Sequence, residues 1–134
     1  MNSIPELLTL TYRDDLAVLI GRWGYQPEPT ELPAQYERLM ASALAHDARH
    51  WLQDIRRRTL NDPATTRWLL TDYFPNLADR FAGQLRVAYL VSPTLHAQVL
   101  AEPGFQASEA YVGQPFAVGF FGDEGAAMAW LREG

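Results

Sequence analysis

The opening of the chain alternates apolar and polar residues in a way that predicts an antiparallel hairpin. Leu8, Leu10 and Tyr12 alternate with threonines, as in a strand that buries one face. The polar turn Arg13-Asp14-Asp15 follows, and residues 16–20 form a second apolar segment. We therefore expect two antiparallel strands before the first helix.

A long amphipathic helix is predicted next, followed by a short strand. Apolar side chains recur at spacings of three and four over residues 32–44, which gives a helix with one buried stripe. Residues 51–55 are mostly apolar and are short enough to form a strand of a sheet. Asp54 lies near the end of this segment, and three consecutive arginines follow Ile55. Polar side chains are therefore expected at one end of this strand.

Helix-start signals recur in the second half of the chain. Asp62 and Pro63 combine an N-cap with a first-turn proline and predict a helix. Pro75 predicts a kink or break near Phe74. The residues that we expect on the buried face of this helix are Trp68, Leu69, Tyr73 and Leu77.

The remaining segments continue the alternation of strands and helices. Residues 85–91 are nearly all apolar, as in a central parallel strand. Ser92-Pro93 repeats the cap and proline, residues 102–115 are expected to be irregular, and residues 116–121 form the last strand before a helix capped by Asp123. The predicted order is ββαβαβαβα, an α/β fold with a mixed four- to five-stranded sheet, and the 134 residues are expected to form a single domain over 1–134.

Composition narrows the class of protein. The formal net charge is −5, and all eleven basic residues are arginines, so the chain lacks the positive field of a nucleic-acid-binding protein. No apolar run approaches the roughly 20 residues of a membrane span, and the first residues do not read as a secretory signal. Cysteine is absent, which excludes disulfides and thiolate chemistry. We expect a cytoplasmic protein.

Several short motifs resemble one family of domains. The element order resembles the STAS-like domains, the fold of the anti-sigma-factor antagonists, and in particular an uncharacterised SpoIIAA-like or STAS/SEC14-like branch. The motifs that carry this resemblance are Leu52-Gln53-Asp54-Ile55-Arg56, Trp68-Leu69 with Phe74-Pro75, Val87-Ala88-Tyr89-Leu90-Val91, and Phe120-Phe121 ahead of Ala127-Met128-Ala129-Trp130-Leu131.

The resemblance implies a partner-binding or ligand-binding role without a reaction. Antagonists of this fold are switched by phosphorylation of a hydroxyl residue just after the third strand. Here Asp54 matches the acid at the strand end, but Ile55 stands where that hydroxyl is wanted. The nearest hydroxyl residues, Thr59, Thr65 and Thr66, do not align with it, so we expect no such switch.

The first candidate site is a partner- or anion-binding surface. It includes Asp54, the arginine loop Arg56-Arg57-Arg58, Arg67 and Asp72. Guanidinium groups bind carboxylates and phosphates, and the helix that starts at Pro63 adds the positive end of its dipole. Consecutive side chains cannot all point one way, so at most two of the three arginines are expected to converge. A solvated loop balanced by nearby acids, with Asp54 in a structural ion pair, is the simpler interpretation.

The second candidate site is an apolar pocket between sheet and helices, lined by Trp68, Tyr73 and Phe74. Such a pocket would suit a small-molecule or lipid carrier. Packing in the core explains the same aromatic residues more simply.

Enzymatic and metal chemistry find little support. His46, Asp47 and His50 have a suggestive spacing, but they fall where a helix gives way to a strand and lack a third ligand. No nucleophile elbow, P-loop or dinucleotide fingerprint occurs. We therefore expect no catalytic residue, no metal and no cofactor, and an unidentified protein as the partner; a homodimer is compatible with the sequence.

Overall fold

The first two strands form the predicted antiparallel hairpin. In the computed structural model, which describes residues 6–103 and 105–133, β1 (Leu8–Arg13) pairs with β2 (Val18–Trp23). The second strand begins two residues later than expected because the turn extends through Ala17, which has a positive φ of 55°.

The described elements follow the predicted order with short helical additions. After β2 they are η1 (Pro29–Glu31), α1 (Leu32–His46), β3 (His50–Asp54), α2 (Pro63–Trp68), η2 (Leu69–Tyr73), α3 (Phe74–Ala78), β4 (Leu85–Leu90), α4 (Pro93–Leu100), η3 (Ser108–Tyr111), β5 (Phe116–Phe121) and α5 (Glu124–Arg132).

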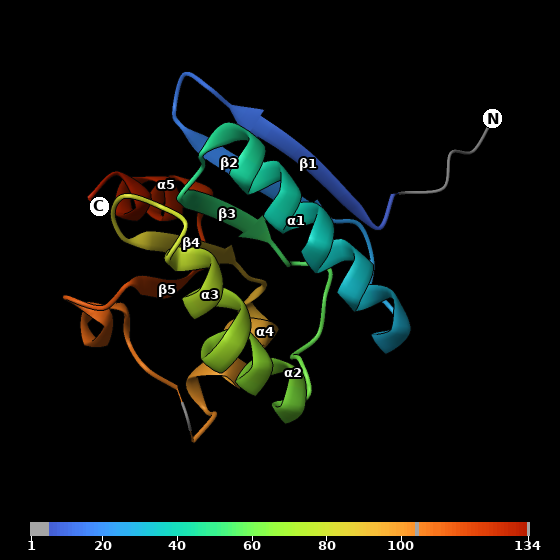
Figure 1. The fold of residues 1–134 in the computed structure, drawn as a ribbon. Coiled ribbons are helices and arrows are strands. Elements are labelled where there is room, and N and C mark those ends of the chain that lie inside the picture. Colours follow the sequence, from blue (N-terminus) through green and yellow to red (C-terminus); the bar gives the residue numbers. More distant parts are fainter. Residues whose placement is uncertain (1–5, 104, 134) are drawn as a thin grey trace.

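All five strands belong to one mixed sheet in the order β1-β2-β3-β4-β5 (Figure 1). From β2 to β5 neighbouring strands run parallel, so their carboxyl ends meet at one edge of the sheet. In this register Arg22 lies beside Asp54, Asp54 beside Leu90, and Leu90 beside Phe121. The strand-end residues that the sequence singles out therefore lie at this carboxyl edge.

The predicted N-caps are confirmed for three helices. The carboxylate of Asp62 accepts a hydrogen bond from the Thr65 amide at 3.1 Å, and Asp123 accepts one from the Ala126 amide at 2.8 Å. The Ser92 hydroxyl accepts one from the Leu95 amide at 3.1 Å. Each bond satisfies an amide that has no partner inside its own helix.

The irregularity expected near Phe74 is a change of helical pitch. α2 continues into one π-helical turn, η2, and then into α3, with the Phe74 amide bonded to the Leu69 carbonyl. Pro75 has no amide hydrogen and its ring crowds the carbonyl four residues earlier, so a wider turn before it avoids a clash without ending the helix.

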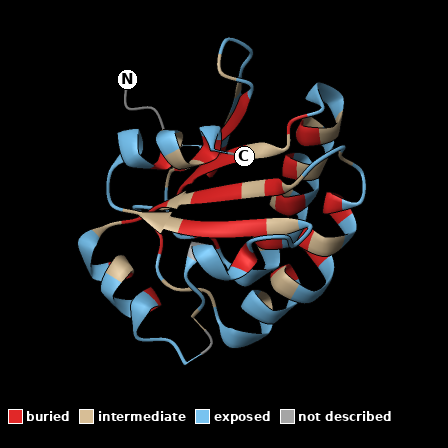
Figure 2. Cartoon of the chain, turned by 90° about the vertical axis from the view of Figure 1, so that its left-hand side faces the viewer, coloured by how far each residue is buried: buried red, intermediate tan, exposed pale blue. Residues whose placement is uncertain are grey.

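Helices cover both faces of the sheet. On one face α1 and α2–α3 pack over Leu19, Trp51 and Val87, while on the other α5 packs over Ile20 and Leu52. Figure 1 shows α1 and α3 on the near side of the sheet and α5 on the far side. Figure 2 shows the buried stretches of the strands enclosed between helices.

A smaller cluster under α4 extends this core. Leu95 and Val99 pack with Val91 near the carboxyl edge.

Trp68 departs from its predicted position. Leu69, Tyr73 and Leu77 are buried as expected, but 39% of the Trp68 surface is exposed. The ring lies against Tyr36 and Tyr73, with centroid distances of 5.5 and 5.1 Å, at the rim of the core.

Among the described residues no helix combines the length and the apolar character needed to cross a bilayer.

Candidate functional site

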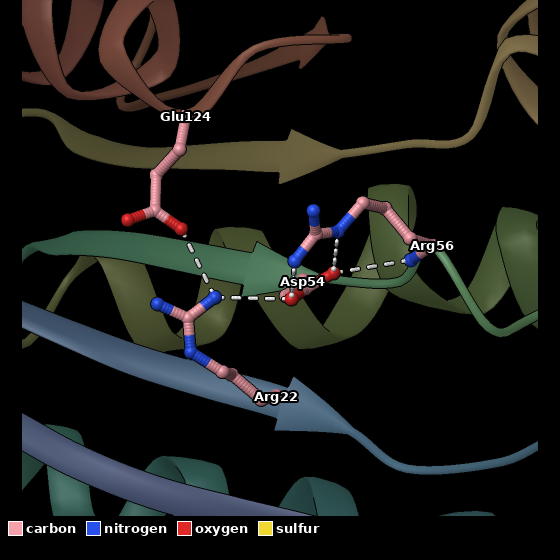
Figure 3. Close-up of polar contacts among 4 residues, drawn as sticks. All are labelled: Arg22, Asp54, Arg56 and Glu124. Carbon is pink, nitrogen blue, oxygen red and sulfur yellow. Dashed lines mark hydrogen bonds and ion pairs between the residues drawn. The ribbon is translucent and has the colours of Figure 1, made fainter.

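A four-residue charge cluster lies at the carboxyl edge of the sheet. It consists of Arg22 from β2, Asp54 from β3, Arg56 just after β3, and Glu124 from the first turn of α5 (Figure 3). Side chains alternate along a strand, so Asp54 points to the same face as Leu52, which α5 covers. The two strands and the helix thereby bring four charges together.

Asp54 is the buried centre of this cluster. Only 7% of the residue is exposed, and both carboxylate oxygens accept hydrogen bonds from the protein. Arg56 makes a two-pronged contact, from Nε to Oδ1 at 2.9 Å and from Nη2 to Oδ2 at 2.8 Å, and its amide donates to Oδ1 at 3.2 Å. Arg22 Nη1 donates to Oδ2 at 3.0 Å. The two parallel hydrogen bonds from Arg56 form a bidentate guanidinium–carboxylate pair.

These contacts decide the ionisation of Asp54. Burial raises the pKa of the carboxyl group, but the hydrogen bonds from the Arg56 side chain and amide and from Arg22 outweigh burial. The pKa of Asp54 is therefore lowered from its usual value, and the group is a carboxylate at neutral pH.

Arg22 links the buried acid to an exposed one. Its Nη1 also donates to Glu124 Oε1 at 3.0 Å, so one nitrogen bridges two carboxylates. The side chains of Arg22, Glu124 and Arg56 are 43%, 46% and 54% exposed, whereas that of Asp54 is 11% exposed. The cluster thus presents guanidinium edges and one carboxylate to solvent, held by a buried anion.

The three consecutive arginines have three different environments. Arg56 folds back onto Asp54, and Arg57 is exposed. Arg58 is only 7% exposed and places its guanidinium over the Trp23 ring at 4.4 Å. Arg56 and Arg58 therefore contact different groups, and an anion site shared by two of the three arginines stays a prediction.

Arg67 and Asp72 lie away from the cluster. Both are exposed, on α2 and η2, which pack on the opposite face of the sheet from α5. Within the described part of the chain, neither forms a hydrogen bond or ion pair with Asp54 or Arg56. A site that includes them together with Asp54 stays a prediction and requires a partner that spans two faces.

The segment after β3 carries no hydroxyl at the strand end. The Ile55 amide donates to the Leu90 carbonyl at 3.0 Å, and its side chain packs with the core. Thr59 is the first hydroxyl residue, and its amide donates to Gln26 Oε1 at 2.7 Å. The Thr65 hydroxyl lies in the first turn of α2 and donates to Asp62.

The aromatic residues of the predicted apolar pocket separate into two places. Trp68 and Tyr73 border a surface groove of about 170 Å³ that also includes Asp72 and Arg80. Phe74 is buried in the core and does not line this groove. Burial raises the pKa of Tyr73, and its protonated hydroxyl donates to the Tyr36 carbonyl at 2.5 Å.

The histidines near the end of α1 are engaged in other contacts. His46 stacks on Tyr12 with a centroid distance of 4.4 Å, and His50 lies 2.9 Å from Arg49 Nη1. Over residues 6–103 and 105–133 no three potential ligands gather in a geometry suited to a metal ion.

The sequence interpretation missed Arg22 and Glu124. Arg22 is the one charged residue in an otherwise apolar strand, and its parallel register with Asp54 carries the signal. Glu124 follows the Asp123 cap, but its distance of 102 residues from Arg22 leaves no local pattern that relates the two.

Comparison with known proteins identifies the fold. No model of a known protein family matches the chain, and no curated protein matches it. A solved structure of an anti-sigma factor antagonist from Mycobacterium paratuberculosis is similar, with a TM-score of 0.56 and 10% sequence identity over 98% of this chain and 99% of that one. Together with the five-stranded mixed sheet and its opening hairpin, this likeness shows that the chain has the fold of the STAS-like domains.

Proposed function

We propose that the chain is a non-catalytic regulatory module that binds a protein partner at the carboxyl edge of its sheet. The observation that carries this proposal is the ordered charge cluster of Arg22, Asp54, Arg56 and Glu124. Its exposed groups are oriented before any partner arrives, which lowers the entropy lost on binding.

The charges suit a partner surface that presents carboxylates. Arg22 and Arg56 keep about half of their side-chain surface in solvent, and the neighbouring Arg57 is exposed. Against these three exposed cations the edge offers two exposed acids, Glu124 and Asp123, the residue that caps α5. Arginine binds carboxylates through planar paired contacts, so acidic side chains on the partner complement this edge.

The state of Asp54 supports a binding role over catalysis. A general acid or base works best with a pKa near the working pH. The pKa of Asp54 is lowered instead, and both of its oxygens already accept hydrogen bonds from arginines. A carboxylate held in this way organises its neighbours and has no free lone pair aimed at a substrate.

The module we propose works without phosphorylation at the end of β3. The four residues after Asp54 are Ile55 and three arginines, and the first hydroxyl, that of Thr59, lies five positions beyond the strand. The similar structure from Mycobacterium paratuberculosis is that of an anti-sigma factor antagonist, which supports action on another protein.

The test is capture of partners with matched charge variants. In cells of the source organism, tagged wild-type chain, Arg57→Glu and Arg132→Glu are cross-linked and purified, and the bound proteins are identified by mass spectrometry. Arg57 and Arg132 are both exposed, and Arg132 lies in the last turn of α5 rather than at the carboxyl edge. We expect one acidic partner that wild type and Arg132→Glu retain and Arg57→Glu loses.

Equal capture by both variants, loss only with Arg132→Glu, or no partner above background would overturn the proposed surface. Raising the salt concentration weakens the captured complex if exposed charges carry it. Cytoplasmic location and homodimerisation stay predictions, which cell fractionation and sedimentation of the purified chain test.

The carrier alternative receives less support from the described residues. The groove beside Trp68 measures about 170 Å³, below the roughly 300–1,000 Å³ of most ligand pockets.

A further inference from the structure

A small cavity with polar walls lies beside β2 and β3, on the face that α1 and α3 cover. Its volume is about 10 Å³, and its walls include Trp23, Gln53 and Arg58 together with tyrosine rings. Trp23 touches both polar side chains: its Nε1 donates to Gln53 Oε1 at 3.1 Å, and its ring lies 4.4 Å below the Arg58 guanidinium carbon.

The side-chain nitrogen of Gln53, which lines this cavity, is a hydrogen-bond donor without an acceptor among the described residues. The residue is 3% exposed, and the bond from Trp23 fixes which end of its amide is the oxygen. Its Nε2 then has no acceptor among the described residues. Gly21 makes room for this amide, since a Cβ there would lie 2.8 Å from Nε2.

The Nε atom of Arg58, a buried cation, is a second donor in the walls of this cavity. The residue is 7% exposed, and its Nη2 donates to Asn61 Oδ1 at 2.6 Å. Its Nε is buried and has no acceptor in the part of the chain that the structure describes. No carboxylate within the described ranges forms an ion pair with Arg58.

We propose that this cavity is a binding site for one hydrogen-bond-accepting atom, either the oxygen of a water molecule or a small monoatomic anion such as chloride. Apolar cavities stay empty, but buried polar groups without partners retain bound water. The volume is at the lower limit of the roughly 10–15 Å³ that one water molecule requires. Because both unpaired atoms are donors and one belongs to a cation, the occupant is an acceptor.

The bound atom ties β3 to the loop that follows it. Gln53 is the penultimate residue of β3, and the Arg58 amide closes a turn onto the Ile55 carbonyl at 3.0 Å. An acceptor shared by the two side chains holds Arg58 inside while Arg56 and Arg57 stay at the surface. This inference stands on the cavity alone and does not depend on the proposed partner.

The test is crystallographic, with the full chain grown in chloride and in bromide. We expect one ordered atom within about 2.7–3.2 Å of both Gln53 Nε2 and Arg58 Nε. An anomalous bromide peak there identifies the occupant as a halide, and an ordered atom without such a peak identifies it as water. An empty cavity, or protein acceptors on both nitrogens, would overturn the proposal.

A solution measurement covers the case in which crystals fail. The side-chain amide protons of Gln53 should show nuclear Overhauser effects to a long-lived water, or a chloride-dependent shift if a halide is bound. Gln84 is the control, since its Nε2 already donates to the carbonyls of Tyr111 and Gln114 at 3.0 and 2.9 Å. In Gln53→Met one donor is lost, and the ordered atom should disappear. A Gln53 amide that exchanges like that of Gln84, with no bound water and no response to chloride, counts against the site.

Discussion

Arg22 and Asp54 are register partners on adjacent parallel strands, and their side chains form an ion pair with Nη1 and Oδ2 3.0 Å apart. The same Arg22 nitrogen contacts Glu124 of α5. One guanidinium thus connects β2, β3 and a helix 102 residues away in sequence. The cluster therefore contributes both to the proposed surface and to the way α5 is fixed on the sheet.

Removing the charge of Asp54 should destabilise the fold. Asp54→Asn keeps the shape of the side chain but leaves Arg22 and Arg56 without their shared anion. Because hydrogen bonds to charged groups contribute more than neutral ones, we expect a loss of about 2 kcal/mol in the free energy of unfolding, measured by urea denaturation.

The control for this prediction is an exposed ion pair of similar geometry. Arg13 Nη2 and Asp15 Oδ2 lie 2.7 Å apart, with side chains 48% and 57% exposed. Asp15→Asn should cost much less than Asp54→Asn because solvent screens such an exposed pair. Equal losses in the two variants would show that the burial of Asp54 adds nothing.

The lowered pKa of Asp54 sets a pH range for this stabilisation. In the unfolded chain an aspartate titrates near pH 4. Because the folded pKa is lower, the contribution of Asp54 is fully present above the unfolded value and is lost as pH falls through the folded one.

The difference in unfolding free energy between wild type and Asp54→Asn should therefore be constant from neutral pH down to about pH 5 and shrink below about pH 4. Parallel denaturation series at both ends of this range measure it. A difference that grows on acidification would mean that the pKa is raised, with burial dominating the arginines.

The sequence predicts those parts of the fold that have local signals. Asp62-Pro63 and Ser92-Pro93 contain the cap and the first-turn proline together, so each helix start follows from neighbouring residues. The prediction that Trp68 is buried is wrong because helical periodicity does not show where the core ends. The Trp68 ring contacts Tyr36 at the rim of the core.

The candidate site could be predicted only in part, because some of its contacts are local in sequence and others depend on how distant elements pack. Asp54 and Arg56 are two residues apart, and their proximity is local. Glu124 reaches the cluster through the packing of α5, and Arg58 turns inward because Trp23 offers it a ring face. Contacts of this kind depend on tertiary structure, which no short pattern records.

The space above Gly21 should be intolerant of a side chain. A Cβ at this position would lie 2.8 Å from Gln53 Nε2, so Gly21→Ala displaces the amide that accepts from Trp23. Because Gln53 is only 3% exposed and accepts a buried hydrogen bond from Trp23, moving its amide disturbs that bond, and we expect a lower thermal midpoint together with a change in tryptophan fluorescence.

Gly122→Ala is the matched control, because a Cβ there meets no atom within 4 Å. It should leave both the midpoint and the fluorescence close to those of wild type. Gly21→Ala with unchanged stability would show that the Gln53 side chain has room to move, and the close approach to Gly21 would then have no structural consequence.

Two neighbouring arginines should differ sharply in their effect on stability. Arg58 is buried over Trp23 and bonded to Asn61, whereas Arg57 is exposed. Arg58→Ala removes a desolvated cation–π contact and buried side-chain packing, so we expect a loss of about 2 kcal/mol and faster hydrogen exchange at the amide of Thr59. Arg57→Ala should change the unfolding free energy by less than about 0.5 kcal/mol. Urea denaturation and hydrogen exchange on the two variants separate these outcomes. If the two substitutions had equal effects, Arg58 would be a solvated loop residue and its inward orientation would be refuted.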